Sequence, residues 1–527
     1  MAPHKAQLTM GALGGAVAAV ALQQLAAKLQ SKWLAIPYAW RRRATRREAW
    51  RWVLLDTAPE WASTEHVHAL RKTVACPAQS VSYANADPLL IVGGHGSRLV
   101  DARGRTFLDT RNNVAHVGHT NPRVAGAVAA AMRAPCPNTR YLQHPNQAAL
   151  AERLLETMPA PLCAGHVFLV NSGSEANDLA LRLCRAWARQ RHKGDCGVVV
   201  LTHAYHGHTV SCIAISPYKH SHPKKRGKPA WVEVADAPDA YRGGGRADAV
   251  EAACARLEAR GITVDALFVE SGASVAGVIV PPEGFLAAAF ESVRRRGGIV
   301  VADEVQTGLG RLGNVWYAFE GHGVVPDVVT IGKPVGNGLP LAAVVVTRKV
   351  SDVFAAGPEY FKTFGGNPVS CAAGLAVLDA IEADDLRGNA TRVGAFLKAG
   401  FERLKCKGGA RCVVGDVRGQ GLFLGIDLVT GVSKAPATAE ASWICARLVT
   451  EHRILTSLDG PGDNVMVVKP PLGFSLSDAA EFLPALEVEL GAANALPVGF
   501  LFTRTPTCCR FVILSLFIPL ATTTTRI

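Results

Sequence analysis

Charged residues are scarce in this sequence of 527 residues: they make up 19% of it, whereas hydrophobic residues make up 49%. This balance excludes a chain that is disordered throughout, because such chains combine low hydrophobicity with high net charge. The 51 glycines and 30 prolines follow no G-X-Y period, which excludes a collagen-like fold. We find no internal repeat. A chain of this length can bury a substantial core.

The 13 cysteines include no CxxC pair. An odd number at irregular spacing favours a reducing compartment over a framework of disulfides. Three histidines stand close together in HAYHGHT (203–209), but no carboxylate or cysteine set lies near them at ligand spacing. We therefore expect no metal site there.

Acidic residues are missing from the first 47 positions, and this uneven charge explains much of the net charge of +13. Residues 1–60 hold nine basic and three acidic side chains, and residues 497–527 hold three arginines and no acid. The middle of the chain therefore has only a small excess of positive charge. It contains no basic stripe interleaved with aromatic residues. We expect no nucleic-acid partner.

The two ends differ from the middle in composition. An apolar stretch from Leu8 to Ala27, with arginines after it and no acid, predicts an organelle-targeting or anchor extension over residues 1–70. We interpret this segment first as a mitochondrial targeting sequence. The alternatives are a plastid transit peptide, a membrane anchor and an ordinary helix. Any contact with a membrane would be made by this segment. Phe511–Leu520 is too short to span a membrane as a helix, and the tail over 497–527 is expected to be disordered.

The middle of the chain alternates apolar runs with helical segments. Five β-branched runs look like buried strands: 197–203, 266–271, 298–304, 328–333 and 342–347. Such continuous runs suit a mainly parallel sheet that is covered on both faces, so we expect an α/β fold. We assign 131–375 to a large domain with this sheet, and 71–130 with 376–496 to a smaller α+β domain that contains a hairpin over 417–428.

Four chemically distinct groups follow the predicted strands. NSGSEAND (171–178) opens a helix whose first N–H groups can bind a phosphate, and Tyr205 offers an aromatic ring. Asp303 and Lys333 end two successive strands. Each feature alone has an ordinary reading, as a helix start, a capping acid or a surface lysine. Because strand ends of such a sheet meet in one crevice, together they match pyridoxal phosphate.

The motifs NSGSEAN, YHGHT, DEVQTGLGR, PDVVTIGK and TFGGNP occur in an order and spacing that resemble the class III branch of pyridoxal-phosphate aminotransferases, a fold type I family. The resemblance covers about residues 80–490. It implies that Lys333 carries the cofactor covalently and that Asp303 keeps the pyridine nitrogen protonated. It further implies that Gln306 bonds the ring hydroxyl, that Tyr205 stacks on the ring and that Gly173 and Ser174 bind the phosphate. Thr363 would reach the cofactor phosphate of a neighbouring subunit, which implies a homodimer with shared active sites.

Within that family the chain resembles most the ethanolamine-phosphate and phosphohydroxylysine phospho-lyases. Stretches such as NVAHVGH (113–119) and EYFKTFGGNPVSCAAGLAVL (359–378) carry this resemblance. It implies elimination of phosphate and ammonia from a phosphorylated amine. The alternatives are an aminotransferase of the alanine–glyoxylate or ω-amino type and a non-catalytic protein on the same fold.

The residue at position 467 helps to distinguish a phospho-lyase from an aminotransferase. Many class III aminotransferases have an arginine three residues before the Pro-Pro pair, where it binds an α-carboxylate, and this chain has Val467. The lyase branch often has a lysine there and an asparagine in place of Lys362, so the chain departs from both patterns. The candidates for binding the substrate are Arg140, Tyr141, Lys219 and Lys362.

Overall fold

The computed structural model describes residues 64–79, 89–134, 143–220, 227–405, 412–431 and 433–495. The predicted N-terminal extension lies outside these residues up to position 63, and the predicted tail over 497–527 lies outside them entirely. Arg140 and Tyr141, two candidates for substrate binding, also lie outside the described residues. In the part of the chain that is described, no helix is both long and apolar enough to cross a membrane.

The chain divides into two compact units. The first comprises residues 1–93, 100–106 and 502–527, and its described helix, α3 (Thr64–Val74), buries none of its side chains. The strands β1 (Ile91–His95) and β2 (Arg98–Asp101) contain residues of both units. The second unit comprises residues 94–99 and 107–501 and contains everything described below.

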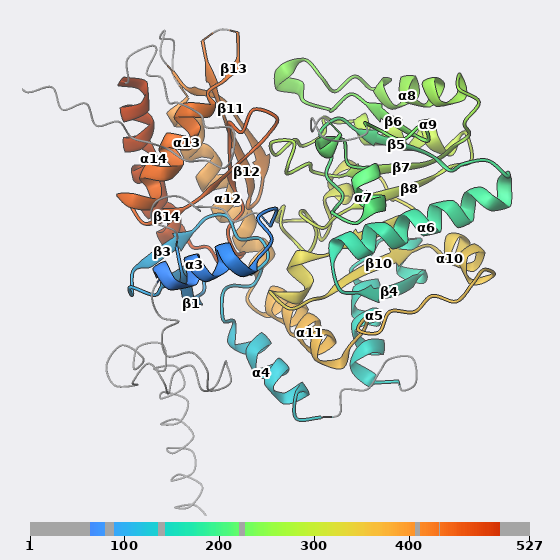
Figure 1. Ribbon diagram of the computed structural model, residues 1–527, viewed down its shortest axis with the longest axis horizontal. Helices are drawn as coiled ribbons and strands as arrows, with labels where there is room; N and C mark the ends of the chain where they lie inside the picture. The colour runs from blue at the N-terminus through green and yellow to red at the C-terminus, as the bar shows by residue number, and fades with distance from the viewer. Residues whose placement is uncertain are drawn as a thin grey trace, which may run out of the picture. The chain divides into compact units, whose positions relative to one another are not determined.

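A seven-stranded sheet forms one part of the second unit, in the order β4-β10-β9-β8-β7-β5-β6 (Figure 1). Its strands are β4 (His166–Val170), β5 (Gly197–Leu201), β6 (Val232–Ala235), β7 (Val264–Glu270), β8 (Ile299–Asp303), β9 (Val328–Ile331) and β10 (Ala342–Val346). The strands from β5 to β9 are parallel, as predicted. The run predicted over 342–347 is also a strand, but β10 is antiparallel to both of its neighbours.

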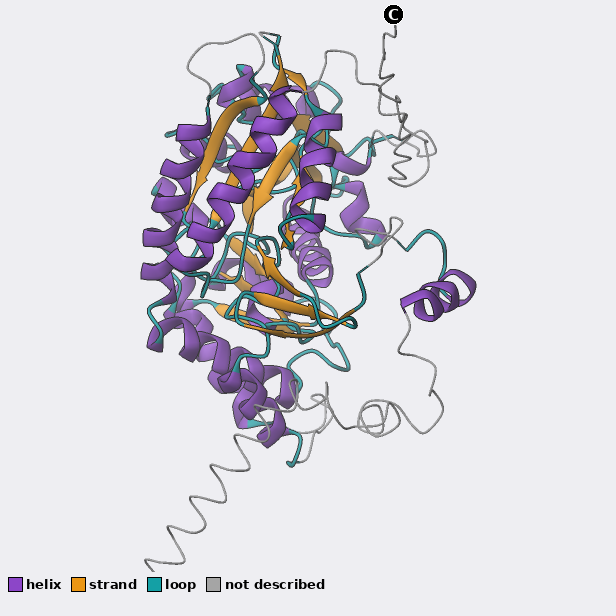
Figure 2. Ribbon diagram, turned by 90° about the vertical axis from the view of Figure 1, so that its left-hand side faces the viewer, coloured by secondary structure: helices purple, strands orange, loops and turns teal. Residues whose placement is uncertain are grey.

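Helices cover this sheet on both faces (Figure 2). Val198 and Val200 pack into one apolar cluster with residues of α6 and α10, whereas Val199 and Leu201 pack into another with residues of α8 and α9. This division follows from the alternation of side chains along a strand. The helices of this part are α6 (Gly173–Arg191), α7 (Val210–Ala214), α8 (Ala249–Glu258), α9 (Phe285–Arg294) and α10 (Arg348–Ala355).

A second, smaller sheet has the order β11-β12-β16-β15, with β13 beside β12. Its first two strands form the predicted antiparallel hairpin. The strands are β11 (Val414–Gln420), β12 (Phe423–Thr430), β13 (Ala435–Pro436), β15 (Ser457–Asp459) and β16 (Val465–Val468). Helices α12 (Leu386–Leu404) and α13 (Thr438–Thr450) contact β12, and α14 (Leu476–Ala495) contacts both helices.

The remaining elements belong to neither of these two sheets. Strand β3 (Thr106–Asp109) pairs in parallel with β14 (Ile454–Leu455), and α11 (Pro368–Ala383) contacts α4 (Pro122–Ala131) and α5 (Pro145–Glu156). The short 3-10 helices are η1 (Leu162–Ala164), η2 (Pro217–Lys219), η3 (Ala240–Arg242), η4 (Ala318–His322) and η5 (Lys333–Gly336). Both sheets belong to one compact unit, so the predicted domain boundary near 375 stays a prediction.

Most of the described cysteines are free thiols. They are Cys76, Cys163, Cys184, Cys196, Cys212, Cys254, Cys371 and Cys445. Cys412 departs from the expected pattern because it is in a disulfide.

Arg311 is a buried cation that connects the two sheets. Its Nη1 donates to the carbonyl oxygens of Leu422 (3.2 Å) and Pro470, and its Nη2 donates to Nδ1 of His116 (3.0 Å). No carboxylate among the described residues forms an ion pair with it, and burial lowers its pKa to about 9. Arg311 therefore satisfies three buried acceptors at the expense of its own hydration.

Replacing Arg311 with methionine is expected to lower the free energy of unfolding by about 3 kcal/mol. Each buried acceptor that is left without a donor costs about 1–3 kcal/mol. Removing the desolvated cation offsets part of that cost. Urea unfolding measures the change. Arg392→Met is the matched control, since Arg392 forms an ion pair with Asp385 at the exposed surface, where solvent screens the two charges, and its loss is expected to leave the free energy of unfolding nearly unchanged. Equal stability of the two variants would contradict this role of Arg311.

Candidate functional site

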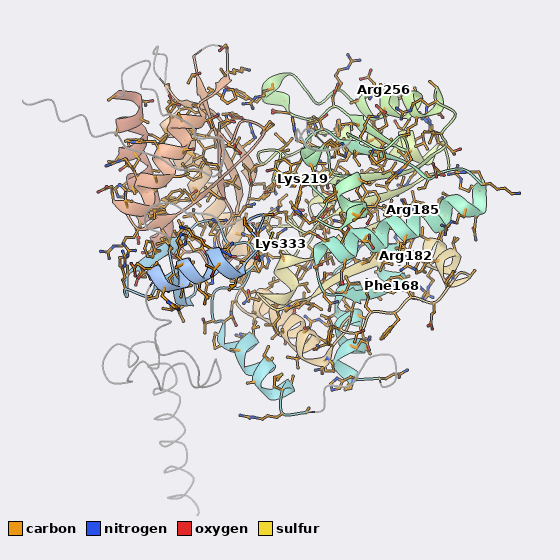
Figure 3. The ribbon with its side chains drawn as sticks, viewed as in Figure 1. Phe168, Arg182, Arg185, Lys219, Arg256 and Lys333 are labelled. Atoms are coloured by element: carbon orange, nitrogen blue, oxygen red, sulfur yellow. The ribbon has the colours of Figure 1, made fainter. Side chains whose placement is uncertain are left out.

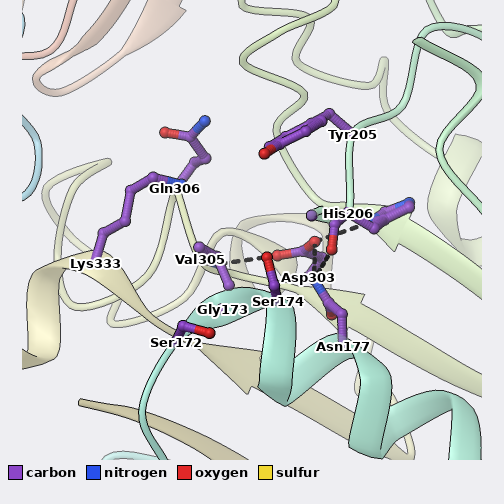
Figure 4. Close-up of a pocket in the computed structure, with 11 residues that line it drawn as sticks. Ser172, Gly173, Ser174, Asn177, Tyr205, His206, Asp303, Val305, Gln306 and Lys333 are labelled. Atoms are coloured by element: carbon purple, nitrogen blue, oxygen red, sulfur yellow. Dashed lines mark hydrogen bonds and ion pairs between the residues drawn. The ribbon is translucent and has the colours of Figure 1, made fainter. Parts of the chain in front are cut away.

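A cavity of about 260 Å³ opens at the carboxyl ends of β8 and β9 (Figure 4). Its lining consists of Ser172, Gly173, Ser174, Asn177, Tyr205, His206, Gly207, Asp303, Val305, Gln306 and Lys333. Every predicted cofactor residue except Thr363 belongs to this lining. The structure thus brings these residues together, while the role of each one stays a prediction.

The start of α6 forms one wall of the cavity. Ser172 caps the helix by accepting a hydrogen bond from the N–H of Glu175 (3.2 Å). The N–H groups of Gly173 and Ser174, in the first turn, have no acceptor within the helix and can bind an anion. A side chain at position 173 would not fit, because its Cβ would lie 2.8 Å from Cγ1 of Val305.

Gly207 brings a second loop close to this helix start. Its φ of +124° disfavours any residue with a side chain, and a Cβ there would lie 2.5 Å from Oγ of Ser174. The same Oγ accepts a hydrogen bond from the N–H of His208 (3.1 Å). The two loops therefore form a narrow cradle whose size depends on glycine at both 173 and 207.

Asp303 is fixed from several sides. Its Oδ2 accepts hydrogen bonds from Nδ2 of Asn177 and from Nδ1 of His206, both at 2.8 Å, and its Oδ1 accepts one from the N–H of Val305 (3.1 Å). Asn177 is held in turn by Thr330, whose hydroxyl donates to it (2.8 Å). This network holds the carboxylate in one orientation within the cavity (Figure 4).

His206 supports Asp303. Burial lowers its pKa, but the hydrogen bond and the charge of Asp303 outweigh burial and raise the pKa overall. Its Nε2 has no hydrogen-bond partner among the described residues. Glu270 lies beside this pair and accepts a hydrogen bond from the N–H of Tyr205 (2.9 Å), and burial raises its pKa to about 7.

Lys333 begins η5, two residues after β9, and its side chain lies in the cavity with Asp303 and Tyr205 (Figure 4). Burial lowers the pKa of its amine, and the charges of Asp303, Glu270 and Asp459 act in the opposite direction. A lowered pKa increases the fraction of neutral amine, the form that acts as a nucleophile or base.

Gln306 has a neighbour that sequence analysis did not single out. Nδ2 of Asn113 donates to its Oε1 (2.5 Å), which orients the amide at the edge of the cavity. Asn177 and His206 were also missed as contributors. Asn177 follows Gly173 by four residues on α6, so a helical period counted from the first glycine would have placed it on the same face.

The two described candidates for substrate binding, Lys219 and Lys362, do not line the cavity. Nζ of Lys219 lies 4.6 Å from the centroid of the Tyr218 ring, and that ring lies 6.1 Å from the ring of Tyr205 (Figure 3). Lys362 is 38% exposed and its Nζ lies 4.0 Å from Oε1 of Glu175. Thr363, next to it, is exposed and does not line the cavity of its own chain.

The lining fits a cofactor that has an aldehyde, a basic ring nitrogen and a phosphate. The amine of Lys333 and the carboxylate of Asp303 share one cavity, and the cradle at Gly173 and Gly207 leaves room for an anion where side chains would fill it. The aromatic ring of Tyr205 is in the same lining.

Comparison with known proteins agrees with this geometry. The family model described as aminotransferase class-III matches residues 79–490. An alanine–glyoxylate aminotransferase 2-like protein of Drosophila melanogaster is 43% identical over 418 residues, 76% of this chain and 82% of that protein. An ethanolamine-phosphate phospho-lyase homologue of Caenorhabditis elegans is 35% identical over 454 residues, 82% of this chain and 94% of that protein. A phospholyase from Arthrobacter, solved with phosphoethanolamine, superposes with a TM-score of 0.74 at 37% identity and covers 82% of this chain and 100% of its own.

Proposed function

Because this chain belongs to the class-III aminotransferase family, we propose that it is a pyridoxal-phosphate-dependent phospho-lyase. Its substrate would be a phosphorylated amine, ethanolamine phosphate or phosphohydroxylysine, from which it eliminates phosphate and ammonia. The observation that carries this proposal is the similarity to the Arthrobacter phospholyase over the whole of that chain. Val467 agrees with it, because a substrate without an α-carboxylate needs no arginine at that position.

The residues of the cavity have separable tasks. When bound, pyridoxal phosphate supplies an aldehyde that captures the substrate amine and a ring that accepts electrons. Lys333 holds the cofactor and then, as general base, takes the proton from the carbon that bears nitrogen. Asp303 keeps the ring nitrogen protonated, Tyr205 stacks on the ring, and Gln306 bonds the ring hydroxyl. The N–H groups of Gly173 and Ser174 bind the cofactor phosphate.

The test uses the full chain loaded with pyridoxal phosphate and supplied with phosphoethanolamine or phosphohydroxylysine. We expect release of inorganic phosphate and ammonia, together with acetaldehyde from phosphoethanolamine, in equal amounts. Lys333→Ala serves as the background. Amino transfer that depends on a 2-oxo acid, without any release of phosphate, would overturn the proposal.

The second candidate function is that of an aminotransferase of the alanine–glyoxylate or ω-amino type. The 43% identity with the Drosophila protein named after that activity favours it. Both functions use the same cofactor residues, so the cavity alone does not separate them. The assay above does, because only the lyase releases phosphate.

A homodimer is part of the proposal. Thr363 is exposed beside Phe364, a phenylalanine that is 69% exposed, and neither lines the cavity of its own chain. We assign Thr363 to the cofactor phosphate of the partner subunit. Light scattering is expected to give twice the chain mass of 55.7 kDa, and Thr363→Ala is expected to weaken cofactor binding. A monomer with full activity would contradict both expectations.

Mitochondrial localisation is also proposed, on the basis of the arginine-bearing segment without acidic residues before Glu48. Fusing residues 1–70 to a fluorescent protein tests it. We expect mitochondrial fluorescence, and fluorescence that stays diffuse, or that marks a plastid or another membrane, would overturn this assignment.

A further inference from the structure

Lys469 is a buried cation that the cofactor site does not use. It follows β16 directly, and it is only 6% exposed. Its Nζ donates a hydrogen bond to Oγ of Ser274 (2.6 Å), and the nearest carboxylate oxygen, Oδ2 of Asp459, lies 3.7 Å away. Since an ammonium has three donors, two of them lack a hydrogen-bond partner among the described residues.

The ion pair with Asp459 is too loose to account for this burial. Another buried carboxylate of the chain, Asp265, meets Arg191 at 2.7 Å. Burying an ammonium is compensated only when the opposite charge is close and the remaining donors are satisfied. At 3.7 Å from its carboxylate, Lys469 meets neither condition.

Backbone hydrogen bonds bring a second cation to the same place. The N–H of Lys469 donates to the carbonyl oxygen of Thr110 (2.8 Å). Arg111 is the next residue after Thr110, so it lies on the segment that is paired with Lys469. The N–H of Gly460 donates to the carbonyl oxygen of Val275 (3.0 Å), which joins the segments of Asp459 and Ser274. Residues that directly follow β3 and β16, residues of the loop after β7, and Asp459 of β15 thus converge.

This cluster acts electrostatically on Lys333. Burial lowers the pKa of Lys469 to about 8, the charge of Asp459 raises it, and the charges of Lys333, Arg311 and Arg111 lower it further. Asp459 in turn raises the pKa of Lys333. The chain places the cluster close to the cavity as well: Glu270, four residues before Ser274, pairs with Asp303 in the sheet, and Asn113, two residues after Arg111, donates to Oε1 of Gln306 (2.5 Å).

We propose that Lys469, assisted by Arg111, binds the phosphate group of the substrate, while Ser274 and Asp459 orient its ammonium. The inference rests on the proposed function, whose substrate carries a phosphate in addition to that of the cofactor. A phosphate dianion supplies acceptors for the two unused donors of Lys469, and charge-assisted hydrogen bonds of this kind are strong. Lys219 and Lys362, which have partners at the edge of the site, are then secondary contributors.

The experiment compares Lys469→Met, Lys469→Arg and the control Lys398→Met in the holoenzyme. Lys398 is a suitable control because it donates a single hydrogen bond, to the carbonyl oxygen of Gly419 (2.9 Å), and lies on α12. Three quantities are measured: KM for phosphoethanolamine, Kd for inorganic phosphate by calorimetry, and the affinity for ethanolamine from the cofactor absorption. In the holoenzyme the cofactor already fills its own phosphate site, so added phosphate reports on the second one.

For Lys469→Met we expect KM for phosphoethanolamine and Kd for phosphate to rise about 10- to 100-fold, the range for loss of a charged hydrogen bond. The affinity for ethanolamine is expected to change less than about twofold, because ethanolamine lacks the phosphate. Lys469→Arg keeps the cation and is expected to retain most of the phosphate affinity. Should Lys469→Met fail to fold, Ser274→Ala, which removes the orienting bond, is expected to raise the same two constants by about 3- to 10-fold.

Three results would overturn this assignment. The first is an equal loss of affinity for phosphoethanolamine and for ethanolamine in Lys469→Met. The second is an unchanged Kd for phosphate in both Lys469→Met and Ser274→Ala. The third is a loss of phosphate affinity in Lys219→Met or Lys362→Met while Lys469→Met keeps it. Failure of the proposed function looks different. In that case the wild type releases no phosphate, while its binding of inorganic phosphate still depends on Lys469.

Discussion

Replacing Lys333 with alanine is expected to lower kcat for phosphate release by about 10⁴-fold or more. Under the proposed function the amine holds the cofactor and also removes the proton, and loss of a general base alone costs about 10²–10⁴-fold. Its position in the cavity with Asp303 supports both tasks. Steady-state release of phosphate, measured at a cofactor concentration that saturates the variant, separates lost catalysis from lost binding.

Lys349→Ala is the matched control for this substitution. Lys349 is an exposed lysine of α10 whose ammonium lies 4.7 Å from the ring centroid of Trp187, and it does not line the cavity. Its variant is expected to keep activity within about twofold. A small primary amine added to Lys333→Ala is expected to restore part of the rate. If Lys333→Ala kept more than a tenth of the wild-type kcat, Lys333 would not be the base.

Replacing Asp303 with asparagine is expected to lower kcat by about 10³-fold, the second-largest effect. The substitution preserves size but removes the negative charge that, under the proposed function, would face the ring nitrogen. Charge placed in advance within a water-poor site is among the larger contributions to catalysis. It also disturbs the acceptors that Asn177 and His206 use. The measurement is kcat at saturating substrate, together with the absorption spectrum of the bound cofactor.

Asp178→Asn provides the comparison for Asp303→Asn. Asp178 lies on α6 next to Asn177 and accepts a hydrogen bond from Ser211, outside the cavity lining. Its variant is expected to retain kcat within about twofold. Equal losses in the two variants would indicate a general effect of removing acids near α6, and the role assigned to Asp303 would then be wrong.

The larger sheet and most of its site were predictable because their signals are local. Continuous β-branched runs predicted β5, β7, β8 and β9, and the charged residues at the ends of two of these runs are Asp303 and Lys333. The direction of β10 was not predictable. A fully buried strand has the same composition whether it runs parallel or antiparallel, and only the tertiary connection decides its direction.

The polar residues that support the site could not be found in the same way. His206 reaches Asp303 across 97 positions, and Lys469 reaches Ser274 across 195. Neither pair has a spacing rule, because each depends on how separate strands come together. The sequence around Lys469 carries no signal of its own, since a lysine before two prolines can equally be a surface residue, and only its burial in the fold distinguishes it.

All residues that line the cavity come from the segment between Ser172 and Lys333, which forms the larger sheet. Strands β15 and β16, which present Asp459 and Lys469, belong to the other sheet. If Lys469 binds the substrate phosphate as proposed, mutations in the second sheet are expected to alter which amine is accepted while every residue that lines the cavity stays the same, although a change at Asp459 would also shift the pKa of Lys333. A directed-evolution library for new amines would randomise positions in β15, β16 and the loop at Ser274 and leave residues 172–177 and 303–306 constant.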